Sequence, residues 1–305
     1  MEDFINVEQL ENLRGKAKRL DKIVTVLSVI SFPLYIWLFY AAMIQEEMPG
    51  IFIAKLIVVA AVLSLGTFGL LWLIIAKHAY NKFNENFKTK YVVQTINEIK
   101  GFEDLRYYQK NGFSWDDVKN MGVVACGDKR YFESEDLLFG IYDNIRFKIS
   151  DVTTKKMVRG NKRNKIKEIF SGQIICLFQF DDMKVSNGYL QIFEKEFLSN
   201  MSGWKAENEI HTENEIFNSR FSVYASDEHN AYYILTPQRM EKIMSFADNI
   251  NGQVSLVFID DKLFVAARRD SMFDANIDEP VSNQRAKITE DAKFIQKAKE
   301  ILVEE

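Results

Sequence analysis

The sequence predicts an α+β protein in which a two-helix transmembrane hairpin is followed by a cytoplasmic domain with a mainly antiparallel sheet and flanking helices. Three observations support this fold class: two long apolar runs near the start of the chain, period-two strand patterns after residue 131, and clear helix-capping signals. The 305 residues are expected to form an amphipathic helix (1–22), the hairpin (23–76), a stalk helix (77–101), an α+β domain (102–275) and a charged helix (276–305).

The two apolar runs are long enough to cross a membrane. The first, Ile23 to Ile44, has no ionisable side chain except tyrosine, and as a helix it is about 33 Å long. The second, Ile51 to Ala76, has one charge, Lys55, close enough to the connecting turn for its ammonium to reach the membrane interface. The alternative is a pair of helices buried in a large soluble core, but their length and the exclusion of charge argue against it.

Charges that flank the two runs predict their orientation. Bases lie before the first run and after the second: Arg14, Lys16, Lys18, Arg19, Lys22, Lys77, Lys82, Lys88 and Lys90. The turn between the runs has Glu46 and Glu47 and no base. By the positive-inside rule, both termini are expected in the cytoplasm. Cys126 and Cys176 then lie on the reducing side and are expected to be free thiols.

The segments beside the hairpin have helical periodicity. Apolar residues recur at three- and four-residue steps from Phe4 to Leu20, which predicts a helix that lies on the membrane or a partner, or docks on the chain's own domain. A stripe from Tyr80 to Ile99 predicts the stalk helix, which ends near Gly101. The tail from Thr289 is expected to be a solvated or partner-binding helix.

The middle of the chain predicts strands joined by short turns. Asn187-Gly188 is a signal for a two-residue hairpin turn, and Asp260-Asp261 marks a second hairpin. Strands are expected at residues 131–133, 137–142, 145–149, 170–180, 188–195, 204–210, 220–226, 229–235, 254–259 and 263–267. Ser114 is expected to cap a short helix, and Thr236 with Pro237 to begin a longer one.

Several short motifs resemble one bacterial family. They are EDLLFG at Glu135–Gly140, IFSG at Ile169–Gly172, FSVYASD at Phe221–Asp227 and YILTP at Tyr233–Pro237, and all of them follow a two-span hairpin. Together they resemble the membrane-anchored proteins catalogued as domain of unknown function 3137. The resemblance implies a bacterial inner-membrane location and no particular activity, and it extends to about Phe273, so that the tail beyond is expected to be particular to this chain.

No residue pattern predicts a catalytic or metal site. The sequence lacks HExxH, GxxxxGK[ST], GxGxxG and GxSxG motifs, and its three histidines, His78, His211 and His229, are scattered. We therefore expect no cofactor, no metal ligand and no catalytic residue. Among the acidic residues, Glu135, Asp136 and Asp227 are the strongest candidates for acid–base chemistry.

The densest charge signal is a run of seven bases in thirteen residues without an acid: Lys155, Lys156, Arg159, Lys162, Arg163, Lys165 and Lys167. This run is expected to be a flexible solvated loop between strands, or to contact anionic lipid headgroups on the membrane. Nucleic acid is a weaker prediction, because aromatic residues are missing from the run and the whole chain has a net charge of −4.

The function that these observations favour is a membrane-anchored cytoplasmic binding or scaffold module. Its expected partners are membrane lipids, a second copy of the chain or another membrane protein. An enzyme that acts on a membrane-associated substrate through the acidic residues is the alternative. A channel or transporter component is a third possibility, but neither span has an acid or base at its centre to line a polar path.

Overall fold

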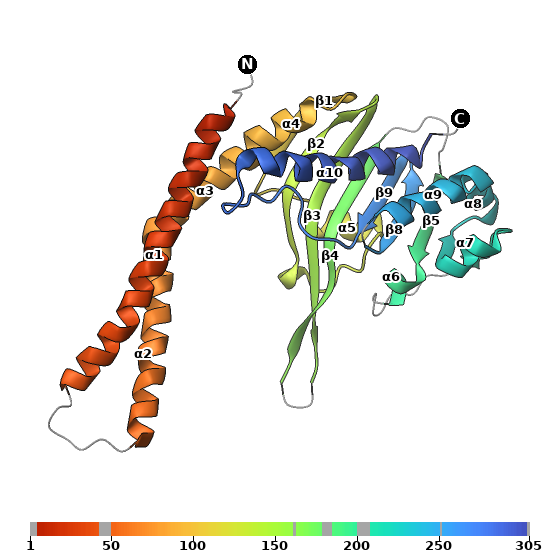
Figure 1. Ribbon diagram of the computed structural model, residues 1–305. Coiled ribbons are helices and arrows are strands. Elements are labelled where there is room, and N and C mark those ends of the chain that lie inside the picture. Colours follow the sequence, from red (N-terminus) through yellow and green to blue (C-terminus); the bar gives the residue numbers. More distant parts are fainter. Residues whose placement is uncertain are drawn as a thin grey trace. The chain divides into compact units, whose positions relative to one another are not determined.

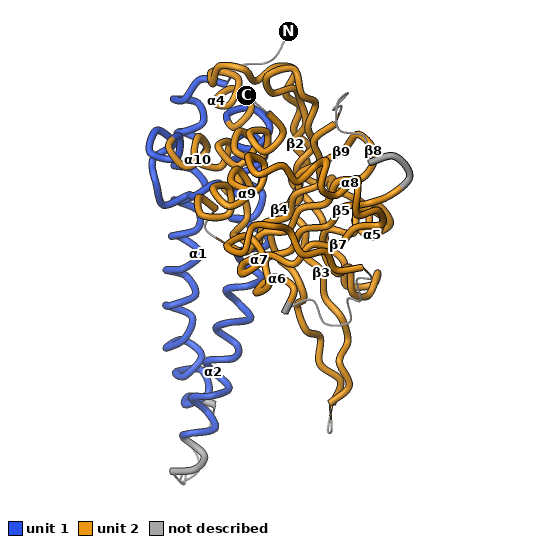
Figure 2. Tube along the Cα trace, turned by 90° about the vertical axis from the view of Figure 1, so that its right-hand side faces the viewer, with its two compact units in different colours: residues 1–91, 275–285 blue, residues 92–274, 286–305 orange. Residues whose placement is uncertain are grey.

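The structure is a computed structural model that describes residues 5–42, 50–160, 163–178, 185–199, 208–250 and 252–303. It consists of two compact units, residues 1–91 with 275–285 and residues 92–274 with 286–305 (Figure 2). The predicted turn at Glu46 and Glu47, the base Lys162 and most of the strand expected at 204–210 lie outside the described residues.

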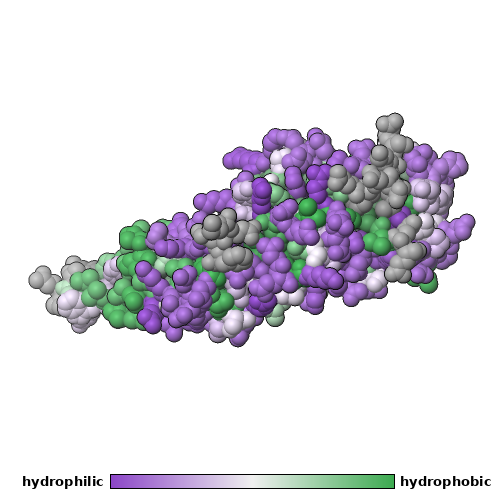
Figure 3. Space-filling model, turned by 90° about the horizontal axis from the view of Figure 1, so that it is seen from above, coloured by the Kyte–Doolittle hydropathy of each residue, from purple (hydrophilic) through white to green (hydrophobic). Residues whose placement is uncertain are grey.

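The first unit contains the predicted apolar helices. Helix α1 (Val7–Ala42) joins the amphipathic segment and the first apolar run, and α2 (Gly50–Leu71) forms most of the second. The π-helical turn η1 (Trp72–Ala76), helix α3 (Lys77–Asn86) and the π-helical segment η2 (Phe87–Val92) follow. Among the described residues, two helices are long and apolar enough to cross a membrane, and their apolar surface is green in Figure 3.

Polar side chains connect α1 to α2 inside this apolar pair. The Ser31 and Ser64 hydroxyls are 3.1 Å apart, and Ser64 Oγ donates to the Ser28 carbonyl oxygen over 2.8 Å. One helical turn away, the hydroxyls of Tyr35 and Thr67 are 2.8 Å apart. Hydrogen bonds between apolar helices fix their register, because a slip leaves polar groups without partners.

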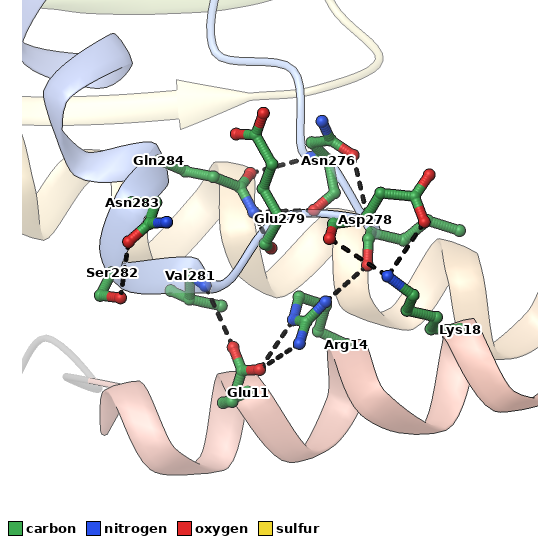
Figure 4. Close-up of polar contacts among 11 residues, drawn as sticks. Glu11, Arg14, Lys18, Asn276, Asp278, Glu279, Val281, Ser282, Asn283 and Gln284 are labelled. Carbon is green, nitrogen blue, oxygen red and sulfur yellow. Dashed lines mark hydrogen bonds and ion pairs between the residues drawn. The ribbon is translucent and has the colours of Figure 1, made fainter.

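The amphipathic face at the start of α1 is covered by the chain itself. Leu10 and Ala17 are buried, and the segment 275–285 lies along the helix (Figure 4). Arg14 Nη1 donates to the Ile277 carbonyl oxygen over 2.7 Å, and Lys18 Nζ is 3.1 Å from Asp278 Oδ1. The start of α1 therefore packs against residues 275–285 of its own chain, within the same unit.

The second unit is built on a nine-stranded antiparallel sheet, counted over the described residues, with the order β1-β2-β3-β4-β9-β8-β5-β7-β6. The strands are β1 (Phe102–Tyr108), β2 (Glu133–Tyr142), β3 (Ile145–Val158), β4 (Lys165–Phe178), β5 (Val185–Glu194), β6 (Glu209–Ile210), β7 (Phe221–Ala225), β8 (Val254–Asp260) and β9 (Lys262–Ala267). This arrangement confirms the predicted fold class.

Both faces of the sheet are apolar at its centre. Register places Ile175 opposite Ile149 and Val265, all fully buried, whereas Cys176 and Phe264 lie on the other face. Helices α9 and α10 lie over one face and α5 over the other (Figure 1). The helices of this part of the chain are α4 (Val93–Asn97), α5 (Trp115–Met121), α6 (Lys195–Ser199), α7 (Glu215–Arg220), α8 (Glu228–Ile234), α9 (Pro237–Asn249) and α10 (Val281–Glu300), with a 3-10 turn η3 (Lys129–Tyr131).

The capping signals are confirmed where they were strongest. Ser114 Oγ accepts from the Asp117 backbone N–H, and Asp117 Oδ2 accepts from the Ser114 backbone N–H, which completes a capping box at α5. Thr236 Oγ1 accepts from the Arg239 N–H at the start of α9, where Pro237 takes the first helical position. The turn between β8 and β9 lies at Asp260 and Asp261, as predicted.

Other predictions are wrong. The strand expected at 229–235 is wrong, because residues 229–234 belong to α8, which begins where the Asp227 carboxylate accepts from the His229 N–H. Asn187-Gly188 lies within β5, beside an irregularity in its pairing with β8, and makes no hairpin turn. The tail helix is not solvated all round, since Ile288, Ala292 and Ile295 are buried. Strand β1 was missed.

A substitution at Gly172 tests how closely the strands of the sheet are packed. A Cβ at this position would lie 2.0 Å from the carbonyl oxygen of Ala267 on the neighbouring strand β9. Gly172→Ala is expected to lower the free energy of unfolding by more than about 2 kcal/mol, because backbone must move to relieve the clash. Gly15→Ala in α1, where no atom lies within 4 Å, is the control and should leave stability unchanged or raise it. Equal melting temperatures for both variants in detergent would contradict this packing.

Candidate functional site

The longest ladder of the sheet, between β3 and β4, continues past the strands beside it (Figure 1). Strand β2 pairs with β3 no further than Thr153, and β9 pairs with β4 no nearer the turn than Gln173. The β3–β4 pairing nevertheless runs on to Val158 and Lys165. We call residues 155–168 the basic arm; residues 161 and 162 within it are not described.

The base of the arm is braced on its β3 edge. The Asp128 N–H donates to the Lys155 carbonyl oxygen over 2.9 Å, and Asp128 Oδ2 accepts from the Met157 N–H over 2.8 Å. Gly127 makes this close approach possible, since a Cβ there would lie 2.4 Å from the Lys155 carbonyl oxygen. The arm is therefore a ladder fixed at one end.

Alternation along the ladder gives the arm two different faces. On one face, Lys155 lies opposite Glu168 and Met157 lies opposite Ile166. The other face has Lys156 opposite Lys167 and Val158 opposite Lys165. Like charges directly opposite each other weaken a strand pair.

The predicted basic residues do come together, but on strands instead of a flexible loop. Lys155 pairs with Glu133 Oε2 over 3.1 Å and is half-buried, as is Lys156. The exposed bases are Arg159, Arg163, Lys165 and Lys167. Lys162 lies outside the described residues. The loop prediction is wrong because β3 and β4 extend into the charged run, where each contributes only one or two apolar residues to the pattern.

Sequence reasoning missed the apolar component of the arm. Met157, Val158 and Ile166 are 45%, 39% and 56% exposed, so that three large apolar side chains lie in water among the bases. Exposed apolar side chains that lie next to one another are typical of a surface that contacts something else, and Met157 lies opposite Ile166. The signal was present in the sequence as Met157-Val158 and Ile166 between bases.

The acidic candidates are separated by the fold. Asp227 caps α8, whereas Asp136 is buried, and Glu135 lies near Asp151 on the neighbouring strand β3. Glu135 and Asp151 line a pocket of only about 60 Å³. Pockets that bind organic ligands have volumes of roughly 300–1,000 Å³. Among the described residues, no three His, Cys, Asp or Glu side chains are placed to hold a metal ion.

Asp151 is the acidic residue that sequence reasoning missed. Its Oδ1 accepts from Gln173 Nε2 over 2.7 Å, and its Oδ2 accepts from the Met272 N–H over 3.2 Å. Burial raises the pKa of Asp151 to about 7, and the negative charges of Asp136 and Asp274 add to this effect, while the Gln173 hydrogen bond opposes it. Burial also raises the pKa of Tyr107, which stays protonated beside Asp136. This cluster can bind and release a proton near neutral pH.

Comparison with known protein families finds a match for the second part of the chain. Residues 168–304 match a family described as "Protein of unknown function (DUF3137)". This part of the chain is similar to the DUF3137 family. The resemblance predicted from the short motifs is thereby confirmed for the motifs after Glu168. No curated protein and no solved structure matches the chain.

The DUF3137 match begins at Glu168, the last residue of the basic arm, and includes the rest of β4 and all elements up to α10. It contains Gln173 and Met272 but not Asp151, their shared hydrogen-bond acceptor. The match also continues through α10 to residue 304, so the expectation that the tail after Phe273 is particular to this chain is wrong.

The raised pKa of Asp151 predicts a pH dependence of stability. The group takes up its proton near pH 7 when folded and near 3.8 when unfolded, so protonation stabilises the fold. This contribution is complete below about pH 4 and is lost as pH rises to about 7, by up to about 1.4 kcal/mol per pH unit. Asp151→Asn should therefore flatten the pH dependence of unfolding, measured by denaturant titration in detergent from about pH 5 to about pH 8.

The control is Asp270→Asn, which changes an exposed acid in the same segment as Met272. It should keep the pH profile of the original chain. The same slope in the Asp151→Asn variant would mean that another group titrates.

Proposed function

We propose that the chain is a membrane-anchored binding module, held by α1 and α2 in the plasma membrane, whose basic arm contacts anionic lipid headgroups on the cytoplasmic side. The observation that carries this proposal is the composition of the arm, in which exposed bases and exposed apolar side chains lie on one free ladder. Surfaces that bind to anionic membranes combine these two features.

The two helices support the anchor. Most of their large side chains are apolar and exposed, including Val29, Leu65 and Ile74 at 67%, 72% and 74%. A soluble protein seldom leaves such a continuous apolar surface in water. The serine and tyrosine hydrogen bonds between the helices satisfy polar groups that lipid would not.

The flanking charges support the orientation. Bases lie before Ile23 and after Ala76, and the connecting turn contains two glutamates and no base. This asymmetry favours both termini in the cytoplasm. With that orientation, the arm and the anionic lipids of the inner leaflet are on the same side of the membrane.

The charge of the arm suits headgroups better than nucleic acid. Each base near an anionic surface contributes about 1 kcal/mol, and Met157, Val158 and Ile166 add apolar contact. The arm has no aromatic side chain on which a base could stack. Anchoring also keeps the arm at high effective concentration near lipid, so that weak contacts are sufficient.

Neutralising the exposed bases tests the proposal. The full chain in nanodiscs of neutral phosphatidylcholine is mixed with phosphatidylcholine vesicles that contain or lack anionic phosphatidylglycerol, and capture is measured by flotation. We expect capture by anionic vesicles only, weaker at high salt. The variant Arg159→Gln/Arg163→Gln/Lys165→Gln/Lys167→Gln should reduce capture at least about tenfold, since four contributions of about 1 kcal/mol are removed.

The matched control neutralises four exposed bases elsewhere in the same unit, Lys100→Gln/Lys110→Gln/Lys119→Gln/Arg130→Gln. It has the same net charge as the arm variant and should bind as the original chain does. Equal loss of vesicle capture in both variants would mean that the total charge of the protein, and not the arm, causes the binding. If the original chain is not captured by anionic vesicles, headgroup contact by the arm is excluded.

A further inference from the structure

A second surface of the sheet unit forms a cavity on the face that carries α5. Its volume is about 370 Å³, within the range of small-molecule sites and larger than the pocket beside Asp151. The sheet contributes Cys176, Phe178 and Phe264 to its wall, and Phe113 and Met121 contribute from the segment around α5. The wall is therefore mainly apolar and aromatic.

Strand register explains how these side chains meet. Lys148 on β3 lies opposite Cys176 on β4, which lies opposite Phe264 on β9, so that the three point to one face. Lys262 lies opposite Phe178 and shares that face. Two lysines thus lie at the rim of an apolar wall. The Cys176 thiol is only 2% exposed and packs as part of the wall.

The charged side chains at the rim favour a ligand with a single negative charge. Lys262 Nζ is 3.4 Å from Asp261 Oδ1, and the Asp117 carboxylate is occupied by the capping box at Ser114. Lys148 Nζ lies 5.7 Å from the centre of the Phe178 ring, within the range of a cation–π interaction. A dianion would meet two nearby carboxylates, and a neutral ligand would leave the Lys148 ammonium without an anionic partner.

We propose that this cavity binds a small monocarboxylate with an apolar body, whose carboxylate reaches Lys148 and whose body lies against Phe178 and Phe264. The frame is rigid, because the wall lies on paired strands and on a helix with a satisfied N-terminus. The site is separate from the basic arm, since none of its lining residues lies within 155–168.

The test uses the full chain in phosphatidylcholine nanodiscs and titration calorimetry, with empty nanodiscs as the blank. The probe is 4-phenylbutanoate, and its neutral match is 4-phenylbutanamide. We expect saturable binding of the acid, weakened about tenfold for the amide and about tenfold in Lys148→Gln, because each change removes a charge-assisted contact. Lys119→Gln, which removes an exposed base of α5 that does not line the cavity, should bind the acid as the original chain does.

A second variant keeps the proposal falsifiable if Lys148→Gln folds poorly. Asn120 is exposed and lines the cavity, so Asn120→Trp should fill it without disturbing the core and should abolish binding. The proposal is overturned if the acid gives no more heat than empty nanodiscs, if the amide binds equally well, or if Asn120→Trp binds the acid unchanged.

Discussion

The β3–β4 ladder is the interaction on which most of the second unit depends. Near the Ile145 and Phe178 ends it is enclosed between β2 and β9, and its apolar side chains there are buried, among them Phe147, Ile149 and Ile175. Beyond Thr154 the same two strands have no other strand beside them in the described part of the chain. One ladder thus joins a rigid core to a projecting basic surface. A change that weakens the core half also changes the position of the arm.

The helices and their caps could be predicted because their signals are local. A long apolar run without charge predicts a helix whatever its neighbours, and Thr236-Pro237 fixes a helix start, because the Thr236 hydroxyl accepts a hydrogen bond from the Arg239 N–H three residues later. The prediction of secondary structure failed where one local signal indicated a strand and another indicated a helix. The β-branched and aromatic residues from Tyr232 to Ile234 predicted a strand, but the Asp227 cap decided for a helix.

The sequence predicted which basic residues form the candidate site but not how they are arranged. Its bases were visible as a charge run, but their arrangement depends on strand register, which sets Lys156 opposite Lys167. Asp151 was missed for the same reason. Its hydrogen bonds come from Gln173 and Met272, which are distant in sequence, and burial of a carboxyl between them cannot be seen in a linear pattern. Non-local contacts of this kind also form the cavity beside Lys148.

We propose that the arm touches anionic lipid while the helices hold the chain in the membrane. The most direct measurement is the depth of a nitroxide label at Val158, in a variant without Cys126 and Cys176, by electron paramagnetic resonance in nanodiscs. With anionic lipid, the label should become more accessible to membrane-dissolved oxygen and less accessible to a water-soluble nickel chelate than with neutral lipid. The same accessibility to both quenchers in the two lipids would contradict the account.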